Sequence, residues 1–219
     1  MTVRLERVGP VLIGTMMGLG RASLMSRDHV NGFKAMLTTS EKDLTVKAMV
    51  LRSDGSDFTL GLRQNPRTAQ RGPTPHSLSA TKRRSPFWRP PLAAPLILAV
   101  HGRCECAGLD LALIADVVVS SRSTSFLYSS VSPDRADVPI RGYSALKTRT
   151  ALAPLFAAGR FSSHAAFQHR LVDDVTRDGK EFDRARDLAF MFAECPPLAI
   201  CEVLAGYEAD STPHRRPFT

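Results

Sequence analysis

Apolar positions in the first fifty residues fall into short blocks separated by turns. Residues 3–8 and 11–17 are apolar or alternate in polarity on either side of a Gly-Pro pair, which predicts a β-hairpin. Apolar residues then recur at helical spacing after Ser26, so we expect a helix that ends near Ser40. Residues 46–51 are typical of a buried strand. A strand, a helix and a strand in this order predict a parallel sheet with a right-handed crossover.

The stretch 63–91 interrupts this regularity. It is rich in Arg, Pro, Ser and Thr and has almost no periodic apolar residue, so we expect an irregular basic loop there. Residues 92–100 predict a strongly apolar strand, and residues 102–108 a turn with two glycines. A short helix at 109–115 should then lead into another apolar strand at 117–120.

The last third of the chain is mainly helical in pattern. After a strand-like segment at 125–129, helices are expected at 143–156, 162–169, 181–194 and 197–207. We therefore divide the chain into an α/β core at 1–175, which contains the basic loop, and a C-terminal helical segment and tail at 176–219.

Positive charge is concentrated in one segment of the chain. The net charge of the chain is +8. Residues 58–104 contain eight Arg and Lys side chains and no acidic residue, so this segment accounts for the whole net positive charge. A basic segment on a neutral body indicates a phosphate-bearing ligand or a solvated loop more than a nucleic-acid-binding face. Trp88 beside Arg89 keeps base stacking as a minor alternative.

The sequence contains no stretch that predicts a secretion signal or a membrane span. Its most apolar region, 91–120, is interrupted by charged residues, and four cysteines in 219 residues do not suggest a disulfide framework. We expect a cytoplasmic, soluble protein. His101, Cys104 and Cys106 lack a fourth metal ligand at a recognisable spacing, so we interpret the cysteines as small side chains near a turn and expect no metal.

Two segments are suited to presenting backbone N–H groups. The first donor segment, 55–61, follows a strand and has a glycine at each end. In the second donor segment, 101–111, an apolar strand breaks into a loop that enters a helix. Amides at the start of a helix have no partner within it and carry partial positive charge. Two such donors aimed at one oxygen would form an oxyanion hole.

These segments resemble the crotonase (enoyl-CoA hydratase/isomerase) superfamily. The resemblance lies in VKAMVL and FTLG within 46–61, in PLILAVHG, AGLDLA and AD within 95–116, and in GRFS, AA and LVDDV within 159–175. The matches follow the family's order. They imply an α/β crotonase-like ββα spiral with a short C-terminal helical region. They also imply an acyl-CoA thioester as substrate, with coenzyme A as part of the substrate and no separate cofactor, and a homo-oligomer, either trimer or hexamer.

The resemblance also assigns roles within the two donor segments. It implies that the backbone amides of Leu60 and Ala107 are the oxyanion donors and that Gly61 and Gly108 lie beside the substrate. The family prefers a small residue where Leu60 stands. Arg63, just beyond the first donor segment, is the nearest candidate for binding a coenzyme A phosphate, because guanidinium groups favour phosphate.

The acid and base positions of the family are only partly filled. Family hydratases divide proton transfer between two carboxylates; Asp110 matches the first position, but Ser130 matches the second and can serve only as a substrate contact. The dienoyl-CoA isomerase branch has a further acid that Asp137 matches after a one-residue gap. A double-bond shift is therefore favoured over hydration, unless Asp134 or Asp137 takes the place of the second carboxylate. Asp137 could equally be a solvated loop charge, and Asp110 a helix-start carboxylate favoured by the helix dipole.

Three functions stay open at this stage. The chain could be an active isomerase or hydratase, a crotonase-like protein that binds thioesters without turnover, or an RNA-binding offshoot. The short tail and Arg170, where the family usually has glycine, favour a divergent member.

Overall fold

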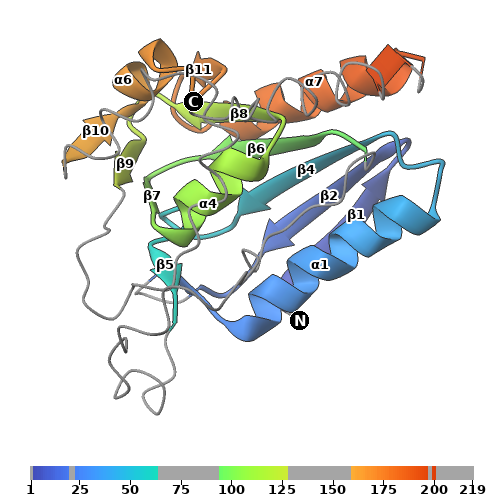
Figure 1. Ribbon diagram of the computed structural model, residues 1–219, viewed down its shortest axis with the longest axis horizontal. Helices are drawn as coiled ribbons and strands as arrows, with labels where there is room; N and C mark the ends of the chain where they lie inside the picture. The colour runs from blue at the N-terminus through green and yellow to red at the C-terminus, as the bar shows by residue number, and fades with distance from the viewer. Residues whose placement is uncertain (1, 20–22, 64–93, 128–158, 197–198, 201–219) are drawn as a thin grey trace, which may run out of the picture.

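The computed structural model describes residues 2–19, 23–63, 94–127, 159–196 and 199–200. Within these ranges the chain forms one six-stranded sheet, a three-stranded sheet and a two-stranded sheet (Figure 1). Nearly all of the predicted basic loop, the helix predicted at 143–156 and most of the helix predicted at 197–207 lie outside the described residues.

The large sheet begins with the predicted hairpin and continues with parallel strands. Its strands, in spatial order, are β1 (Val3–Val8), β2 (Val11–Met16), β4 (Ala48–Ser53), β6 (Leu96–Val100), β8 (Val117–Ser121) and β11 (Asp174–Thr176). The β1–β2 pair is antiparallel, and every later pair is parallel. The predicted hairpin and the parallel arrangement of the following strands are both confirmed.

Four helices have both ends within the described ranges. They are α1 (Arg27–Lys42), α4 (Ala107–Ile114), α6 (Ser163–Gln168) and α7 (Glu181–Glu194). Helix α1 connects β2 to β4 and starts where the sequence predicts, directly after Ser26. The Ser26 N–H donates to His29 Nδ1 at 3.0 Å, and His29 Nε2 lies 2.9 Å from the Met17 carbonyl oxygen, so this histidine ties the start of α1 to the end of β2.

The large sheet is buried on both faces. In β6, Leu96, Leu98 and Val100 belong to the core shared with α1 and α4, whereas Ile97 and Ala99 belong to the core under α7. Figure 1 shows α1 and α4 on one side of the sheet and α7 on the other. Burial on both faces explains why this strand is a continuous apolar run with no polar alternation.

Two small sheets carry the candidate site. Strands β7 (Arg103–Glu105), β9 (Ser125–Leu127) and β10 (Arg160–Ser162) pair in the order β10-β9-β7, and β3 (Leu24–Met25) pairs in parallel with β5 (Gly61–Leu62). The predicted turn at 102–108 is therefore partly wrong, because it contains a strand, and α4 begins at Ala107, two residues earlier than expected. None of the helices within the described ranges combines the length and hydrophobicity that crossing a bilayer requires.

Candidate functional site

The two donor segments lie against each other. Thr59 of the first forms a parallel β-bridge with Cys104 of the second. The Glu105 N–H donates to the Thr59 carbonyl at 2.8 Å, and the Thr59 N–H donates to the Arg103 carbonyl at 3.3 Å. Main-chain hydrogen bonds therefore fix the relation between the two donor segments.

The closest approach is at Gly108. A Cβ atom at this position would lie 2.9 Å from Thr59 Cγ2 and 3.1 Å from the Thr59 carbonyl oxygen. Glycine therefore lets the first turn of α4 pack directly on Thr59. The sequence also predicts a pocket between the two donor segments, but Thr59 and Gly108 are in direct contact and no pocket separates these two residues.

The start of α4 presents the Ala107 amide. The residue before it, Cys106, has a φ of 52°, a left-handed conformation that turns the chain sharply into the helix. The Cys106 N–H donates to the Leu127 carbonyl at 3.1 Å, and the Asp110 N–H donates to the Cys106 carbonyl at 3.0 Å. The Ala107 N–H, buried at the positive end of the helix, has no hydrogen-bond acceptor among the described residues.

The Leu60 amide is engaged within the protein. Its N–H donates to the Ser23 carbonyl at 2.8 Å, next to the parallel pairing of β3 with β5. Of the two amides that the resemblance assigns to an oxyanion hole, the Leu60 N–H thus has an acceptor in this structure, whereas the Ala107 N–H has none among the described residues. An external oxygen can reach the Leu60 N–H only after the Ser23 carbonyl withdraws.

An ion pair that the sequence reasoning missed clamps the donor segments together. The Arg103 backbone N–H and Nε donate to Asp57 Oδ1 at 3.0 and 3.1 Å, and the other side of the guanidinium donates to Asp57 Oδ2 at 2.9 Å. Hydrogen bonding from Arg103 is the main reason that the pKa of the buried Asp57 is lowered to about 2. The sequence does contain a signal for this pair, because Asp57 is the one acid of the first donor segment and Arg103 is the one Arg or Lys of the second.

Gly102 allows this clamp to close. Its φ is +59°, and a Cβ atom there would lie 2.3 Å from the Ser56 carbonyl oxygen and 2.9 Å from Asp57 Cα. No side chain fits this gap unless the first donor segment moves. The glycine is thus required both for its conformation and for the close approach of the two backbones.

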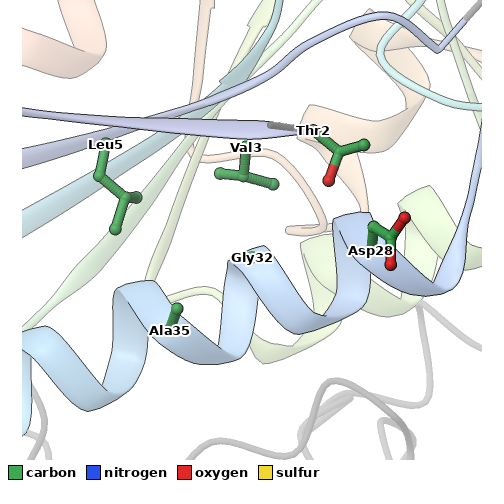
Figure 2. A pocket seen from close by; sticks show the side chains of 6 residues that line it. All are labelled: Thr2, Val3, Leu5, Asp28, Gly32 and Ala35. Atoms are coloured by element: carbon green, nitrogen blue, oxygen red, sulfur yellow. The ribbon is translucent and has the colours of Figure 1, made fainter.

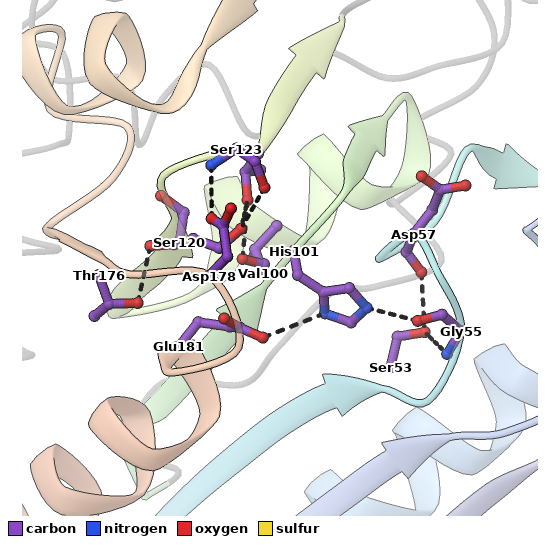
Figure 3. Close-up of polar contacts among 12 residues, drawn as sticks. Ser53, Gly55, Asp57, Val100, His101, Ser120, Ser123, Thr176, Asp178 and Glu181 are labelled. Carbon is purple, nitrogen blue, oxygen red and sulfur yellow. Dashed lines mark hydrogen bonds and ion pairs between the residues drawn. The ribbon is translucent and has the colours of Figure 1, made fainter.

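His101 supports the first donor segment (Figure 3). The His101 Nε2 lies 2.7 Å from the Gly55 carbonyl oxygen, so this nitrogen is the donor. The main-chain carbonyl of His101 accepts the Phe58 N–H at 2.9 Å. Its Nδ1 lies 3.8 Å from Glu181 Oε1, at the start of α7. His101 therefore connects α7 to the turn that precedes the Leu60 amide.

Cys104 and Cys106, which follow His101 in the second donor segment, are buried free thiols. Burial raises the pKa of the Cys104 thiol well above its usual value, with smaller contributions from Glu105, Cys106 and Asp110. A raised thiol pKa opposes the thiolate form that metals bind. No group of three or more potential metal ligands occurs among the residues that the structure describes.

Asp110 occupies the first turn of α4, three residues after Ala107, and is partly exposed. The same helix turn therefore presents an amide donor and a carboxylate. Arg63 is exposed directly after β5, where its N–H donates to the Met25 carbonyl at 2.7 Å. Ser130 and Asp137, the other predicted site residues, lie outside the described residues.

Glu105 is a further acidic group that the sequence reasoning did not single out. It lies on β7, within the second donor segment, and forms an ion pair with Arg160 of β10, with 2.7 Å between Oε1 and the guanidinium nitrogen. Arg160 also donates to Ser125 Oγ at 3.1 Å. This pair stabilises the three-stranded sheet beside the site.

A small hollow lies elsewhere on the molecule, between α1 and the edge strand β1 (Figure 2). It has a volume of about 240 Å³ and is lined by Thr2, Val3, Leu5, Asp28, Gly32 and Ala35. Ligand pockets usually enclose about 300–1,000 Å³. The hollow shares no lining residue with the donor segments, and it is too small for a coenzyme A thioester.

Comparison with known proteins gives a family match over most of the chain. The family described as enoyl-CoA hydratase/isomerase matches residues 23–216. Curated relatives include the carnitinyl-CoA dehydratases of Salmonella agona and Salmonella choleraesuis, each 30% identical over 124 residues, or 55% of this chain and 47% of the relative. The chain thus matches about half the length of these curated relatives.

Solved structures show the same fold over nearly the whole chain. A probable enoyl-CoA hydratase/isomerase from Mycobacterium abscessus has a TM-score of 0.78 at 22% identity, with 97% of this chain and 84% of that chain covered. An enoyl-CoA hydratase subunit I from Geobacillus kaustophilus has a TM-score of 0.80 at 23% identity, with 96% and 82% covered. The predicted α/β crotonase-like fold is confirmed.

Proposed function

Because this chain belongs to the enoyl-CoA hydratase/isomerase family, we propose that it binds an acyl-CoA thioester and stabilises the enolate formed when a double bond of the acyl chain shifts. The observation that carries this proposal is the packing of Thr59 on Gly108, which holds the Leu60 and Ala107 backbones in adjoining segments. Asp110 lies in the same first turn of α4, three residues after Ala107.

The proposed chemistry needs an oxygen site and a movable proton. The Asp110 carboxylate removes a proton from a carbon of the acyl chain, and the electrons of that C–H bond move onto the thioester oxygen. The Ala107 N–H at the positive end of α4 and the Leu60 N–H stabilise the resulting enolate oxygen. Asp110 then returns the proton to a different carbon, so the double bond has moved and no atom has been gained or lost.

We favour isomerisation over hydration because the second carboxylate position of the hydratases is Ser130 in this chain. Hydration requires one group to activate water and another to protonate carbon, whereas a double-bond shift can use one group for both proton transfers. Within this proposal Asp137 is the candidate second acid of a dienoyl-CoA isomerase. Gly61, Gly108 and Ser130 are candidate substrate contacts, and the exposed Arg63 is the candidate ligand of a coenzyme A phosphate.

The proposed function also includes assembly of the chain into a trimer or hexamer.

Ultraviolet absorbance with two substrates tests the proposal. Conversion of a 3,5-dienoyl-CoA brings the diene into conjugation with the thioester and increases absorbance, whereas hydration of a 2-enoyl-CoA removes conjugation and decreases it. We expect turnover of the dienoyl substrate. Turnover of the 2-enoyl substrate alone would refute the preference for isomerisation, and failure to bind either thioester would refute the proposed function.

One observation favours a second candidate, an acyl-CoA-binding protein without turnover. The Leu60 N–H donates to the Ser23 carbonyl. Of the two proposed oxyanion donors, only the Ala107 N–H therefore has no acceptor in the described part of the chain. Removal of one donor from an oxyanion hole typically lowers kcat by about 100- to 1,000-fold. Binding of both thioesters with no absorbance change would support this candidate.

A further inference from the structure

The Ser23 carbonyl accepts the Leu60 N–H, which the proposed function assigns as a donor to the acyl carbonyl. It accepts the Leu60 N–H at 2.8 Å and also accepts the Thr59 hydroxyl at 2.9 Å. A peptide carbonyl and a thioester carbonyl are both hydrogen-bond acceptors of the same N–H geometry. An acyl group that bonds to the Leu60 N–H must therefore replace the bond that Ser23 makes.

The side chain of Ser23 is held in this position by the clamp between the donor segments. Ser23 Oγ donates to Asp57 Oδ2 at 3.0 Å, and Arg103 fixes the same carboxylate from its other sides. Ser23 is 2% exposed and has a φ of 47°. A left-handed conformation is unfavourable for a residue other than glycine, and it persists where its surroundings over-determine it. The hydrogen bond to Asp57 is one such determinant.

We propose that the Ser23 carbonyl competes with the acyl carbonyl of the substrate for the Leu60 N–H, and that the Ser23–Asp57 hydrogen bond sets the strength of this competition. The inference rests on the proposed function, because it takes the Leu60 N–H as a donor to the thioester. Ser23 is accordingly a positioning residue. The apparent affinity for an acyl-CoA is reduced by the fraction of molecules in which Ser23 occupies the donor.

The competition makes the effect specific to ligands that carry an acyl carbonyl. A thioether analogue of coenzyme A, with CH₂ in place of the C=O group, cannot use the Leu60 N–H and has nothing to gain from the withdrawal of Ser23. A saturated acyl-CoA and its thioether analogue therefore form the probe pair, with affinities measured by titration calorimetry.

Ser23→Ala removes the bond to Asp57 and keeps the backbone. Since a hydrogen bond to a charged group contributes about 1.5–3 kcal/mol, acyl-CoA affinity should increase by about tenfold or more, while thioether affinity stays within about twofold. Thr59→Val removes the second donor to the Ser23 carbonyl with little change of shape and should act in the same direction. Ser40→Ala is the matched control, because Ser40 is buried and its hydroxyl has no hydrogen-bond partner in the described structure. It should alter neither affinity.

The outcomes separate the inference from the function on which it rests. An increase confined to the acyl-CoA supports the inference. If wild type binds both ligands, but Ser23→Ala and Thr59→Val leave acyl-CoA affinity unchanged or raise both affinities equally, the inference is wrong and the proposed function survives. If folded wild-type protein binds neither ligand, the proposed function fails and the inference fails with it.

Discussion

Single residues determine how the two donor segments are held together. The ionised carboxylate of Asp57 accepts hydrogen bonds from the Arg103 main chain, the Arg103 guanidinium and Ser23 Oγ. Each bond joins parts of the chain that are at least 34 residues apart. Such a bond stabilises the fold only while the carboxylate is charged, so its contribution depends on pH.

The pH dependence follows from the lowered pKa of Asp57. Because this pKa falls from 3.8 to about 2 on folding, the stabilisation is present above about pH 4 and is lost between about pH 4 and pH 2. Burial raises the pKa of Asp173, so ionisation of Asp173 destabilises the fold as the pH rises. This effect is opposite in sign to that of Asp57 and falls at higher pH. Urea unfolding of wild type and Asp57→Asn should show a stability difference of about 2 kcal/mol at pH 5 that narrows towards pH 2.5. A difference independent of pH would contradict this account.

Asp110 carries the proposed proton transfer. Asp110→Asn keeps the shape of the side chain and removes the titratable group, so turnover should fall by about 100- to 10,000-fold with acyl-CoA affinity largely unchanged. Steady-state kinetics combined with direct binding checks this. Asp137→Asn should have a comparable effect if the chain is a dienoyl-CoA isomerase. Wild-type activity in Asp110→Asn would show that another residue transfers the proton.

Some of these residues could be assigned from sequence and others could not. The roles of Leu60, Ala107 and Asp110 rest on short motifs that resemble the crotonase family, and they stay predictions. Asp57 and Arg103 are 46 residues apart, and their pairing depends on the β-bridge between Thr59 and Cys104. Hydrophobic periodicity carries no information about that register. The engagement of the Leu60 amide by Ser23 was unpredictable for the same reason.

At the scale of elements, the site is built from strands of two or three residues. Strands β3, β5 and β7 are too short to show alternation, and their partners are distant in sequence. The sequence therefore predicts one continuous turn where the structure has β7 followed directly by α4. The longer helices α1 and α7 were predicted within two residues at each end, because several turns of apolar spacing define them.

Gly102 is the position at which element packing is most sensitive. Gly102→Ala places a Cβ atom 2.3 Å from the Ser56 carbonyl oxygen, in addition to the cost of a positive φ. We expect a loss of about 3 kcal/mol or more in the free energy of unfolding, measured with urea. Gly179→Ala is the matched control, since Gly179 has a φ of +79° and no atom within 4 Å of the added Cβ. It should lose only about 1 kcal/mol. Equal losses would show that the close approach at Gly102 has no energetic consequence.

For the whole molecule, the sequence predicts the sheet better than it predicts the site. The apolar blocks at 3–8, 46–51, 92–100 and 117–120 each overlap a strand of the large sheet. Strand β11 escaped prediction because it has three residues, all partly exposed. Helix α7 packs on β4, β6 and β8 through a stripe of small side chains that includes the buried Ala185 and Ala189. The proposed boundary near residue 175 stays a prediction.

The central claim is that the Leu60 and Ala107 amides bind the acyl carbonyl of a coenzyme A thioester. Infrared difference spectroscopy of the protein with an acyl-CoA that carries ¹³C at the carbonyl observes this bond directly. Two N–H donors on one oxygen polarise the C=O bond, so its stretching frequency in the complex should be lower than in water. Ser23→Ala should increase the fraction of ligand at the lower frequency. A bound thioester with the frequency of the free ligand, in both wild type and Ser23→Ala, would contradict the account.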